Sequence, residues 1–428
     1  MNPIAQELNS ALAGTVVSQL LSEFGKRFYF PKGIVSQAGE AKEKAHKFNA
    51  TVGMATIKGS PMYLESVREQ VPGLTPAQMF PYAPTPGVPE LRKKWREEMD
   101  VKNPSLKGKL TSLPLVTSGL THGISTVADM FLNAGDPIII PDMFWGNYTL
   151  IFEGRNRASI IKFDFFNDEG RINLAQLDTA IANLQGDKFA VILNFPNNPT
   201  GYSPSVKESE EIVSLLEKWA DNGKKILAIT DDAYFGLFYE DETLKESLFG
   251  TFADLHENIL AVKVDGATKE NFAWGFRLGF LTYASKGLNG EQLDALTQKT
   301  MGAIRASISN SSKMAQTLVL NSLPADTYWK EKEEGFKILK ARYLKVKEVV
   351  ASFGSDSPLK PLPFNSGYFM TFRYKGNSEK LRIHLLDKYG VGTISIQERY
   401  LRIAFSSVEL DDIEELYTII NKAAQEVL

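Results

Sequence analysis

The amino-acid sequence predicts an α/β protein in which a mostly parallel central sheet is flanked by helices. Two short apolar runs, at residues 225–230 and 259–265, have the length and composition of parallel strands that are buried on both faces. Each run ends in a cluster of polar side chains, and in an open α/β sheet such clusters gather beyond the carboxyl ends of the strands. Similar runs at residues 136–141, 159–166 and 189–195 complete the set of central strands that we expect.

Helices are expected before and between these strands. Residues 1 to about 30 carry apolar side chains at helical spacing and predict one long N-terminal helix; these side chains are Ile4, Leu8, Leu12, Val16 and Leu20. Residues 113–136 have the pattern of a strand, a glycine loop and a helix. Because a helix N-terminus presents free N–H groups and a positive dipole end to a phosphate, Leu120 and Thr121 are candidate phosphate contacts.

The C-terminal part of the chain predicts a smaller α+β unit. Residues 326–353 have the pattern of a long amphipathic helix, and residues 364–374 and 393–407 alternate like strands. Ser406 and Glu409 have the spacing of a capping box, which predicts the start of the last helix.

Length and composition fit two globular domains. The chain has 428 residues, of which 43% are hydrophobic and 23% charged, as is ordinary for folded proteins with cores of their own. We expect a large domain at residues 65–320 and a small domain assembled from both termini, residues 1–64 and 321–428.

Charge and residue usage argue against several classes of function. The formal net charge of -3 offers no basic surface for nucleic acid, and no apolar run approaches the ~20 residues that a membrane helix needs. The sequence has no cysteine, which excludes disulfides and thiol nucleophiles and agrees with a cytoplasmic location. The histidines lack metal-ligand spacing, so we expect no metal site; they are His46, His122, His256 and His384.

Four side chains after the first two runs suit one cofactor, pyridoxal phosphate (PLP). Asp231 and Tyr234 follow one run, and Lys269 and Arg277 follow the other. A lysine amine can bond to the aldehyde of PLP, an aspartate can keep the pyridine nitrogen protonated, and an arginine can bind the phosphate through two parallel hydrogen bonds. A single lysine after a strand is usually a solvated loop residue, so the prediction depends on the order and spacing of all four.

These residues belong to a longer series of motifs that resembles the class I and II aminotransferases of PLP fold type I. The series is Asn198-Pro199-Thr200-Gly201, Asp231-x-Ala233-Tyr234, Lys269 with Arg277, and Arg402 in the run RYLRIAFSS. The motifs occur in the family's order over nearly the whole chain, and the aspartate aminotransferases are the branch that it resembles most. The resemblance implies the fold type I architecture, PLP as cofactor and transamination as the reaction.

The resemblance also implies roles around the cofactor. Lys269 corresponds to the catalytic lysine, which holds PLP and later moves a proton on the substrate. Asn198 and Tyr234 correspond to donors of hydrogen bonds to the 3′ oxygen of PLP. Trp145 is expected to stack on the pyridine ring, with Phe144 as the alternative.

Two positions depart from the family pattern. Gly266 stands where the family has a serine that touches the phosphate, so we expect Thr268 to supply the hydroxyl group. Tyr148 stands where aspartate aminotransferases have a histidine behind the aspartate, which leaves open what supports Asp231.

For the substrate, the resemblance implies that Arg402, Asn198 and the backbone of Gly53 bind the α-carboxylate. Arg305, which a serine follows four residues later, is similar to an arginine that reaches the distal carboxylate from the neighbouring subunit. Tyr82 is similar to a tyrosine that reaches the partner's PLP phosphate. We therefore expect a homodimer with shared active sites. Each assignment has a simpler alternative: Gly53 as a turn glycine, Arg305 as a surface or interface arginine paired with a nearby acid, and Tyr82 as a buried structural tyrosine.

The expected function is the transfer of an amino group between an amino acid, aspartate or glutamate, and a 2-oxo acid such as 2-oxoglutarate. Aromatic or other neutral amino acids are alternative donors, and a PLP lyase or decarboxylase is an alternative enzyme, because the cofactor motifs do not separate these. A non-catalytic effector-binding module is disfavoured, since Lys269 is present and the chain has no basic helix-turn-helix segment. A Rossmann dehydrogenase is disfavoured because no G-x-G-x-x-G motif follows a strand.

Overall fold

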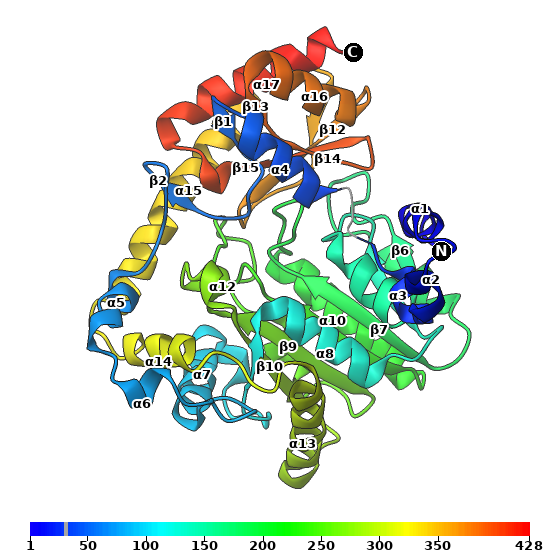
Figure 1. Cartoon of the computed structure of the whole chain (residues 1–428), viewed down its shortest axis with the longest axis vertical. Helices are drawn as coiled ribbons and strands as arrows, with labels where there is room; N and C mark the ends of the chain where they lie inside the picture. Colours follow the sequence, from blue (N-terminus) through cyan, green and yellow to red (C-terminus); the bar gives the residue numbers. More distant parts are fainter. Residues whose placement is uncertain (30–32) are drawn as a thin grey trace.

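A seven-stranded sheet forms the centre of the protein (Figure 1). The computed structural model describes residues 1–29 and 33–428. The strand order is β4-β10-β9-β8-β7-β5-β6, and the bounds are β4 Leu115–Ser118, β5 Pro137–Pro141, β6 Ser159–Phe163, β7 Lys188–Asn194, β8 Lys225–Asp231, β9 Ile259–Gly266 and β10 Leu278–Ala284. The strands run in one direction except β10, which is antiparallel to both of its neighbours. The prediction of a mostly parallel sheet is confirmed.

The middle strands of this sheet are buried along almost their whole length. In β7 and β8 every residue after the first lysine is buried, and in β9 all but one are buried. Parallel strands with helices on both faces have no solvent side, which explains why these runs show no alternation of polar and apolar residues. Strand β10 is equally buried, although it is not among the predicted strands.

Helices flank the central sheet, as predicted. Helix α8 packs against β4, β9 and β10, while α10 and α11 pack against each other and both contact β8. The bounds are α5 Glu65–Arg68, α6 Pro76–Met79, α7 Pro89–Lys102, α8 Gly119–Phe131, α9 Leu174–Ala182, α10 Val206–Asp221, α11 Leu248–Phe252, α12 Ala267–Glu270, α13 Gly290–Ser307 and α14 Lys313–Ser322. Among the described residues, no helix has both the length and the apolar character needed to cross a membrane.

A second, four-stranded antiparallel sheet lies at the other end of the molecule, near the C-terminus (Figure 1). Its order is β11-β12-β15-β14, with bounds β11 Leu359–Pro361, β12 Phe369–Tyr374, β14 Ile394–Ile396 and β15 Tyr400–Ala404. The helices of this region are α4 Ile34–Lys44, α15 Tyr328–Ala351, α16 Ser378–Tyr389 and α17 Ile413–Glu426. The long helix predicted at residues 326–353 is confirmed as α15, whereas the domain limits at residues 65 and 320 stay a prediction.

The N-terminal and C-terminal parts of the chain meet beside the second sheet. Strand β1, Phe48–Asn49, pairs in parallel with β13, Val391–Gly392. A short hairpin follows, formed by β2 Thr56–Ile57 and β3 Ser60–Pro61. This crossing of the two termini carries Gly53 towards the central sheet.

The single long N-terminal helix predicted for residues 1–30 is wrong. The described residues form three short helices, α1 Pro3–Ala11, α2 Val16–Leu20 and α3 Glu23–Arg27. Gly14, between α1 and α2, has φ +78°, which a right-handed helix does not allow. The hydroxyl of Ser22 accepts a hydrogen bond from the N–H of Gly25 and so starts α3 as a separate helix. Phe30, where the prediction ended, lies outside the described residues.

The capping box predicted at Ser406 and Glu409 is also wrong. The hydroxyl of Ser406 donates to the carbonyl oxygen of Met54 (3.1 Å), and the carboxylate of Glu409 accepts from Arg342 (2.9 Å). Helix α17 begins only at Ile413. Contacts with distant parts of the chain use the two side chains that the local pattern assigned to a cap.

Candidate functional site

A cavity of about 190 Å³ lies at the carboxyl ends of the central parallel strands. Its lining residues are Leu120, Thr121, Trp145, Asn194, Asn198, Asp231, Ala233, Tyr234, Thr268, Lys269 and Arg277. The structure therefore brings together nine of the ten residues that the sequence analysis assigned to the cofactor, Tyr82 being the exception. Asn194 and Ala233 were not predicted, although each stands within four residues of a predicted side chain.

Asp231 is the last residue of β8, and its carboxylate is buried, with 3% of the residue exposed. The carboxylate accepts a hydrogen bond from the N–H of Ala233 (3.2 Å) and another from the hydroxyl of Tyr148. Burial raises the pKa of Asp231 to about 6, although the hydrogen bond from Tyr148 and the charge of Lys269 act in the opposite direction. Tyr148 is fully buried, and its hydroxyl is the partner of Asp231 that the sequence left open.

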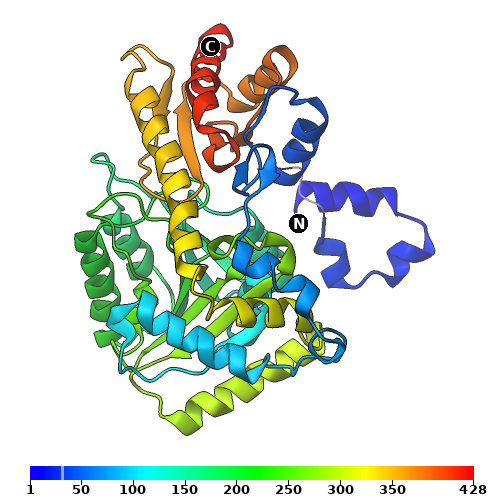
Figure 2. The same cartoon turned by 90° about the vertical axis from the view of Figure 1, so that its left-hand side faces the viewer.

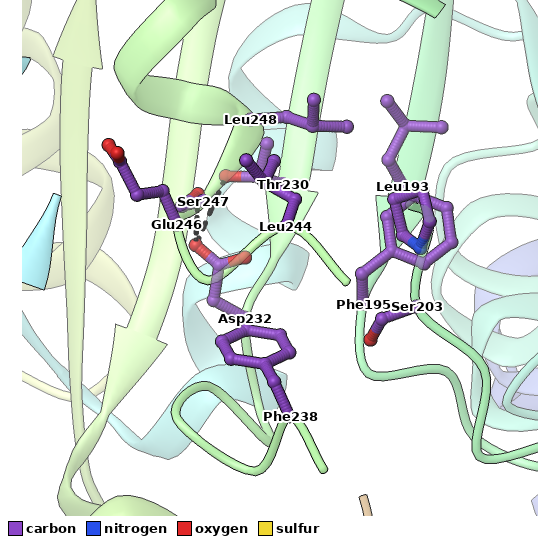
Figure 3. A pocket seen from close by; sticks show the side chains of 11 residues that line it. Leu193, Phe195, Ser203, Thr230, Asp232, Phe238, Leu244, Glu246, Ser247 and Leu248 are labelled. Carbon is purple, nitrogen blue, oxygen red and sulfur yellow. Dashed lines mark hydrogen bonds between the residues drawn. The ribbon is translucent and has the colours of Figure 1, made fainter. Parts of the chain in front are cut away.

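The neighbouring residue, Asp232, belongs to a different environment (Figure 3). Its carboxylate accepts from the hydroxyl of Ser247 (2.6 Å) and forms a buried ion pair with Lys263 of β9. Asp232 lines a separate cavity of about 10 Å³, roughly the space that one buried water needs. Of the two adjacent aspartates, only Asp231 lines the larger cavity.

Lys269 projects from α12, a single helical turn that starts where β9 ends. Its amine lies 4.7 Å from the centre of the Tyr234 ring. Burial lowers the pKa of Lys269 to about 8; Asp231 opposes this shift and Arg277 adds to it. At pH 7 about a tenth of such an amine is neutral, far more than for an ordinary lysine. This neutral amine can act as a nucleophile or take up a proton.

Arg277 and the N-terminus of α8 lie at one end of the cavity. Arg277 adopts a left-handed conformation with φ +52°, and a Cβ atom on Gly119 would stand 2.5 Å from its guanidinium. Glycine at position 119 therefore lets the guanidinium approach the first turn of α8. Leu120 and Thr121 follow directly, so a cation and free N–H groups face the same space.

The departure at Gly266 has a steric explanation. A Cβ atom there would lie 2.5 Å from the carbonyl oxygen of Leu278 on the neighbouring strand, so no serine fits. Within the described residues, the hydroxyl of Thr268 is buried and has no hydrogen-bond partner. A buried polar atom without a partner is costly, and a phosphate oxygen at this end of the cavity would satisfy it.

The aromatic wall of the cavity is Trp145. Of the two candidates for stacking, Trp145 lines the cavity. Phe144 instead lies parallel to Tyr148 at 6.4 Å, and the amine of Lys162 stands over it at 5.0 Å.

Arg402, on β15 of the second sheet, does not line the cavity itself but contacts Asn198, which does. Its guanidinium donates to the side-chain oxygen of Asn198 (3.0 Å) and to the carbonyl oxygen of Thr51 (2.8 Å), and the residue is 2% exposed. Burial lowers the pKa of Arg402 to about 10, with Tyr234 opposing the shift. Its Nε is buried without a partner in the described part of the chain, so this N–H is free to donate to an anion.

Gly53 lies beside the same group of residues. A Cβ atom on it would be 3.0 Å from the ring of Phe369 and 3.4 Å from the hydroxyl of Tyr234. Phe369 itself lies under the guanidinium of Arg402, 4.4 Å away. The structure thus brings Gly53 and Arg402 together around Phe369, next to the cavity residues Tyr234 and Asn198.

Tyr82 and Arg305 do not line the cavity of their own chain. Tyr82 is 89% exposed, so the alternative of a buried structural tyrosine is wrong for the single chain. Arg305 is exposed and donates to the hydroxyl of Ser309 (2.6 Å). Within residues 1–29 and 33–428, no carboxylate lies within ion-pair distance of Arg305, so its alternative as a surface arginine paired with an acid of its own chain is wrong, while pairing at an interface stays a prediction.

The chemistry of the cavity fits PLP. A phosphate requires cations and N–H or O–H donors, which Arg277, Thr268 and the start of α8 supply. A pyridinium nitrogen requires a buried carboxylate, and Asp231 is one. An aldehyde requires an amine with a lowered pKa, and Lys269 has one.

Comparisons with known proteins agree with this chemistry. The family model for aminotransferase class I and II matches residues 55–420. The tyrosine aminotransferase of Caenorhabditis elegans is 27% identical over 168 residues, which cover 39% of this chain and only 33% of that protein. The aspartate aminotransferase of Pyrococcus horikoshii is 25% identical over 358 residues, which cover 79% of this chain and 82% of that protein.

A solved aminotransferase from Anaerococcus prevotii has the same fold. It is 24% identical, with a TM-score of 0.84 over 95% of this chain and 99% of that chain. The architecture is that of PLP fold type I. Because the family match spans most of the chain and the cavity supplies what PLP requires, the chain belongs to the PLP-dependent class I and II aminotransferases.

Proposed function

We propose that the protein transfers an amino group between aspartate or glutamate and a 2-oxo acid such as 2-oxoglutarate. The observation that carries this proposal is the convergence on one cavity of the buried carboxylate of Asp231 and the amine of Lys269, with the buried guanidinium of Arg402 beside it. An amino acid has an amine and a carboxylate at a fixed separation. In the proposal the amine is transferred at Lys269, where PLP is held, and the carboxylate binds to Arg402.

PLP, when bound, supplies an aldehyde that accepts the amino group and a ring that accepts electrons from the substrate. In the proposal Asp231 keeps a proton at the ring nitrogen, because a buried carboxylate is stabilised by an adjacent cation. Asn198 and Tyr234 donate to the 3′ oxygen, and Trp145 holds the plane of the ring. Lys269 moves a proton between the Cα of the amino acid and C4′ of PLP.

The phosphate contacts in the proposal come from one end of the cavity. Arg277 donates through its guanidinium, Leu120 through its backbone N–H at the start of α8, and Thr121 through its hydroxyl group. Thr268 gives its unpartnered hydroxyl and so replaces the missing serine at Gly266.

The substrate contacts come from the other end. Arg402 binds the α-carboxylate together with the side-chain amide of Asn198. The unpartnered Nε of Arg402 and its contact with Asn198 support this assignment. The N–H of Gly53 completes this group, and the absence of a side chain there leaves room beside Phe369.

The proposal includes a homodimer with shared cavities. Tyr82 exposes 89% of an aromatic side chain, and exposed aromatic residues are typical of interfaces. Arg305 is a cation without a carboxylate partner among the described residues. In the dimer, Arg305 of the partner subunit meets the distal carboxylate of the substrate, and Tyr82 of the partner subunit meets the phosphate. A cytoplasmic location goes with this proposal, because the sequence has no cysteine.

An aromatic amino acid is the second candidate donor. The observations in its favour are the similarity to a tyrosine aminotransferase and the aromatic rings of Trp145 and Phe369 beside the cavity. A lyase or decarboxylase is the alternative reaction.

The reaction class is tested by mixing the holoenzyme first with glutamate and then with 2-oxoglutarate. Transamination predicts that the visible absorbance of bound PLP is lost in the first step and returns in the second. Release of carbon dioxide, or a loss of absorbance that 2-oxoglutarate does not reverse, would contradict the proposal.

The substrate class is tested with Arg305→Leu. Removing one partner of a buried charge pair costs ~3–5 kcal/mol, so kcat/KM for aspartate and glutamate should fall roughly a hundred- to several-thousand-fold. The value for phenylalanine should be unchanged or higher. Lys299→Leu, on the same exposed helix, is the matched control. An equal loss for all three amino acids, or none for the two acids, would favour the aromatic donor.

A further inference from the structure

The three residues that follow Lys269 all contact α15, the long helix that runs towards the second sheet (Figure 2). The carboxylate of Glu270 is buried and accepts from Lys332 of α15 (2.8 Å) and from Lys102 of α7 (2.7 Å). Burial alone would raise the pKa of Glu270, but the two lysines outweigh it and lower the pKa to about 2. Glu270 is therefore ionised and held from two sides.

The next two residues continue this contact. The side-chain amide of Asn271 donates to the buried hydroxyl of Tyr328 (2.8 Å). Phe272 packs so closely on α15 that a Cβ atom at Gly335 would stand 2.6 Å from its ring. Tyr328, Lys332 and Gly335 have the i, i+4, i+7 spacing of one helical face. One face of α15 thus meets three consecutive residues after the lysine.

Further along, the same helix is attached to the strand that carries Arg402. The guanidinium of Arg342 is buried; it donates to the carbonyl oxygen of Ser406 (2.6 Å) and to Glu409 (2.9 Å). Ser406 stands two residues beyond the end of β15. Lys332 and Arg342 are ten residues apart, or about 15 Å along a helix. A rigid element therefore joins the turn of Lys269 to the neighbourhood of Arg402.

We propose that Glu270 and Lys332 are positioning residues, which fix the α12 turn to α15 and so set where the amine of Lys269 lies relative to the α-carboxylate site at Arg402. The inference rests on the proposed roles of Lys269 and Arg402. Neither Glu270 nor Lys332 lines the cavity, so both act through the backbone of α12. Because α15 also holds the end of β15, a shift of the second sheet changes the position of Lys269.

The principal test is Lys332→Met, which keeps the length of the side chain and removes its charge. A looser α12 turn admits water to the amine of Lys269. Since burial is what lowers the pKa of that amine, its titration midpoint in the apoprotein should rise by about one unit. The midpoint is measured from the pH dependence of acetylation of Lys269 by acetic anhydride, quantified by mass spectrometry of the peptide. In the holoenzyme kcat should fall about ten- to a hundredfold, with little change in KM.

Three further variants separate positioning from a general loss of stability. Lys332→Arg keeps the charge and should restore most of kcat and the midpoint. Lys337→Met removes an exposed ion pair with Glu333 on the same helix and should change neither quantity. Tyr328→Phe removes only one hydroxyl, so it folds even if Lys332→Met does not; it should move the midpoint in the same direction by a smaller amount.

The outcomes are distinct. If Lys332→Met and Tyr328→Phe lower only the melting temperature and leave kcat and the midpoint of Lys269 as in the wild type, the pair is merely structural and the proposal is overturned. The apoprotein measurement contains no substrate, so a wrong assignment of the amino donor does not affect it. A wrong role for Lys269 would appear separately, as substantial turnover in Lys269→Ala.

Discussion

The hydroxyl of Tyr148 donates a hydrogen bond to the carboxylate of Asp231; both groups are buried, and Asp231 lines the cavity. This bond stabilises the ionised form of a carboxylate whose pKa burial raises to about 6. The two residues come from different parts of the chain: Tyr148 lies in the segment after β5, and Asp231 is the last residue of β8. Tyr148 thus forms the hydrogen bond to the aspartate at the position where, by the resemblance, aspartate aminotransferases have a histidine.

Tyr148→Phe should move the activity to higher pH. A hydrogen bond to a charged group contributes about 1.5–3 kcal/mol, so its loss should raise the pKa of Asp231 by roughly one to two units. Since the ionised carboxylate is the active form, the acid limb of the kcat profile should shift upwards by the same amount. Tyr283→Phe, which removes a buried hydroxyl bonded to Thr300, is the control. An unchanged profile in Tyr148→Phe would mean that the bond does not affect Asp231.

Asp231→Asn should leave the fold intact and slow turnover severely, by about a hundredfold or more, because asparagine cannot keep the pyridine nitrogen protonated. Asp232→Asn should behave differently, since it leaves Lys263 buried beside a weaker partner and lowers the melting temperature. The two variants are compared by kcat and by thermal unfolding. Near-normal turnover in Asp231→Asn would remove Asp231 from the mechanism.

Arg402→Lys keeps the positive charge and loses the planar fork that binds a carboxylate with two hydrogen bonds. It also loses the bonds to Asn198 and Thr51. We expect kcat/KM to fall about a hundredfold for every amino acid tested. A loss confined to some amino acids would assign Arg402 to the substrate side chain, and Arg399 would then be the candidate for the α-carboxylate.

The stability of the apoprotein should rise between pH 8 and 10.5. In this window the unfolded chain still protonates Lys269, whereas the folded chain, with a pKa of about 8, does not. The gain from this group should be about 1–2 kcal/mol, less than the full shift implies because the amine faces a solvent-accessible cavity. Urea unfolding of the wild type and of Lys269→Ala at pH 8 and pH 10 measures the difference. Equal pH dependence in both proteins would show that the amine titrates normally.

The chemistry at the strand ends could be predicted from the sequence because it is local. Asp231 and Lys269 each follow an apolar run directly, and the edge of a parallel sheet brings such positions together. Strand β10 carried the same kind of signal, an apolar run at residues 278–284, but its antiparallel direction has no signature in composition. The prediction of one long N-terminal helix is wrong for a different reason. The apolar residues keep helical spacing on both sides of Gly14, but the φ angle of Gly14 is one that no right-handed helix adopts.

Contacts between distant segments could not be predicted. The bond between Tyr148 and Asp231 depends on β7 lying between β5 and β8, which the order of elements along the chain does not reveal. The ion pair of Glu270 with Lys332 likewise depends on α15 lying beside the α12 turn, far away in the sequence. For Tyr82 and Arg305 the resemblance is the basis of the assignment, and a single chain leaves both outside the cavity.

The loop after β7 joins the two sheets more closely than its place in the sequence suggests. Gly201 has φ +76°, and a Cβ atom there would collide with the carbonyl oxygen of Phe369. The carbonyl oxygen of Gly201 accepts from the N–H of Ser366 (2.8 Å). The hydroxyl of Thr371 donates to the carbonyl oxygen of Pro199 (2.7 Å). Chimeras that exchange the C-terminal region with that of a relative must therefore move this loop along with it, or redesign both sides of the seam together.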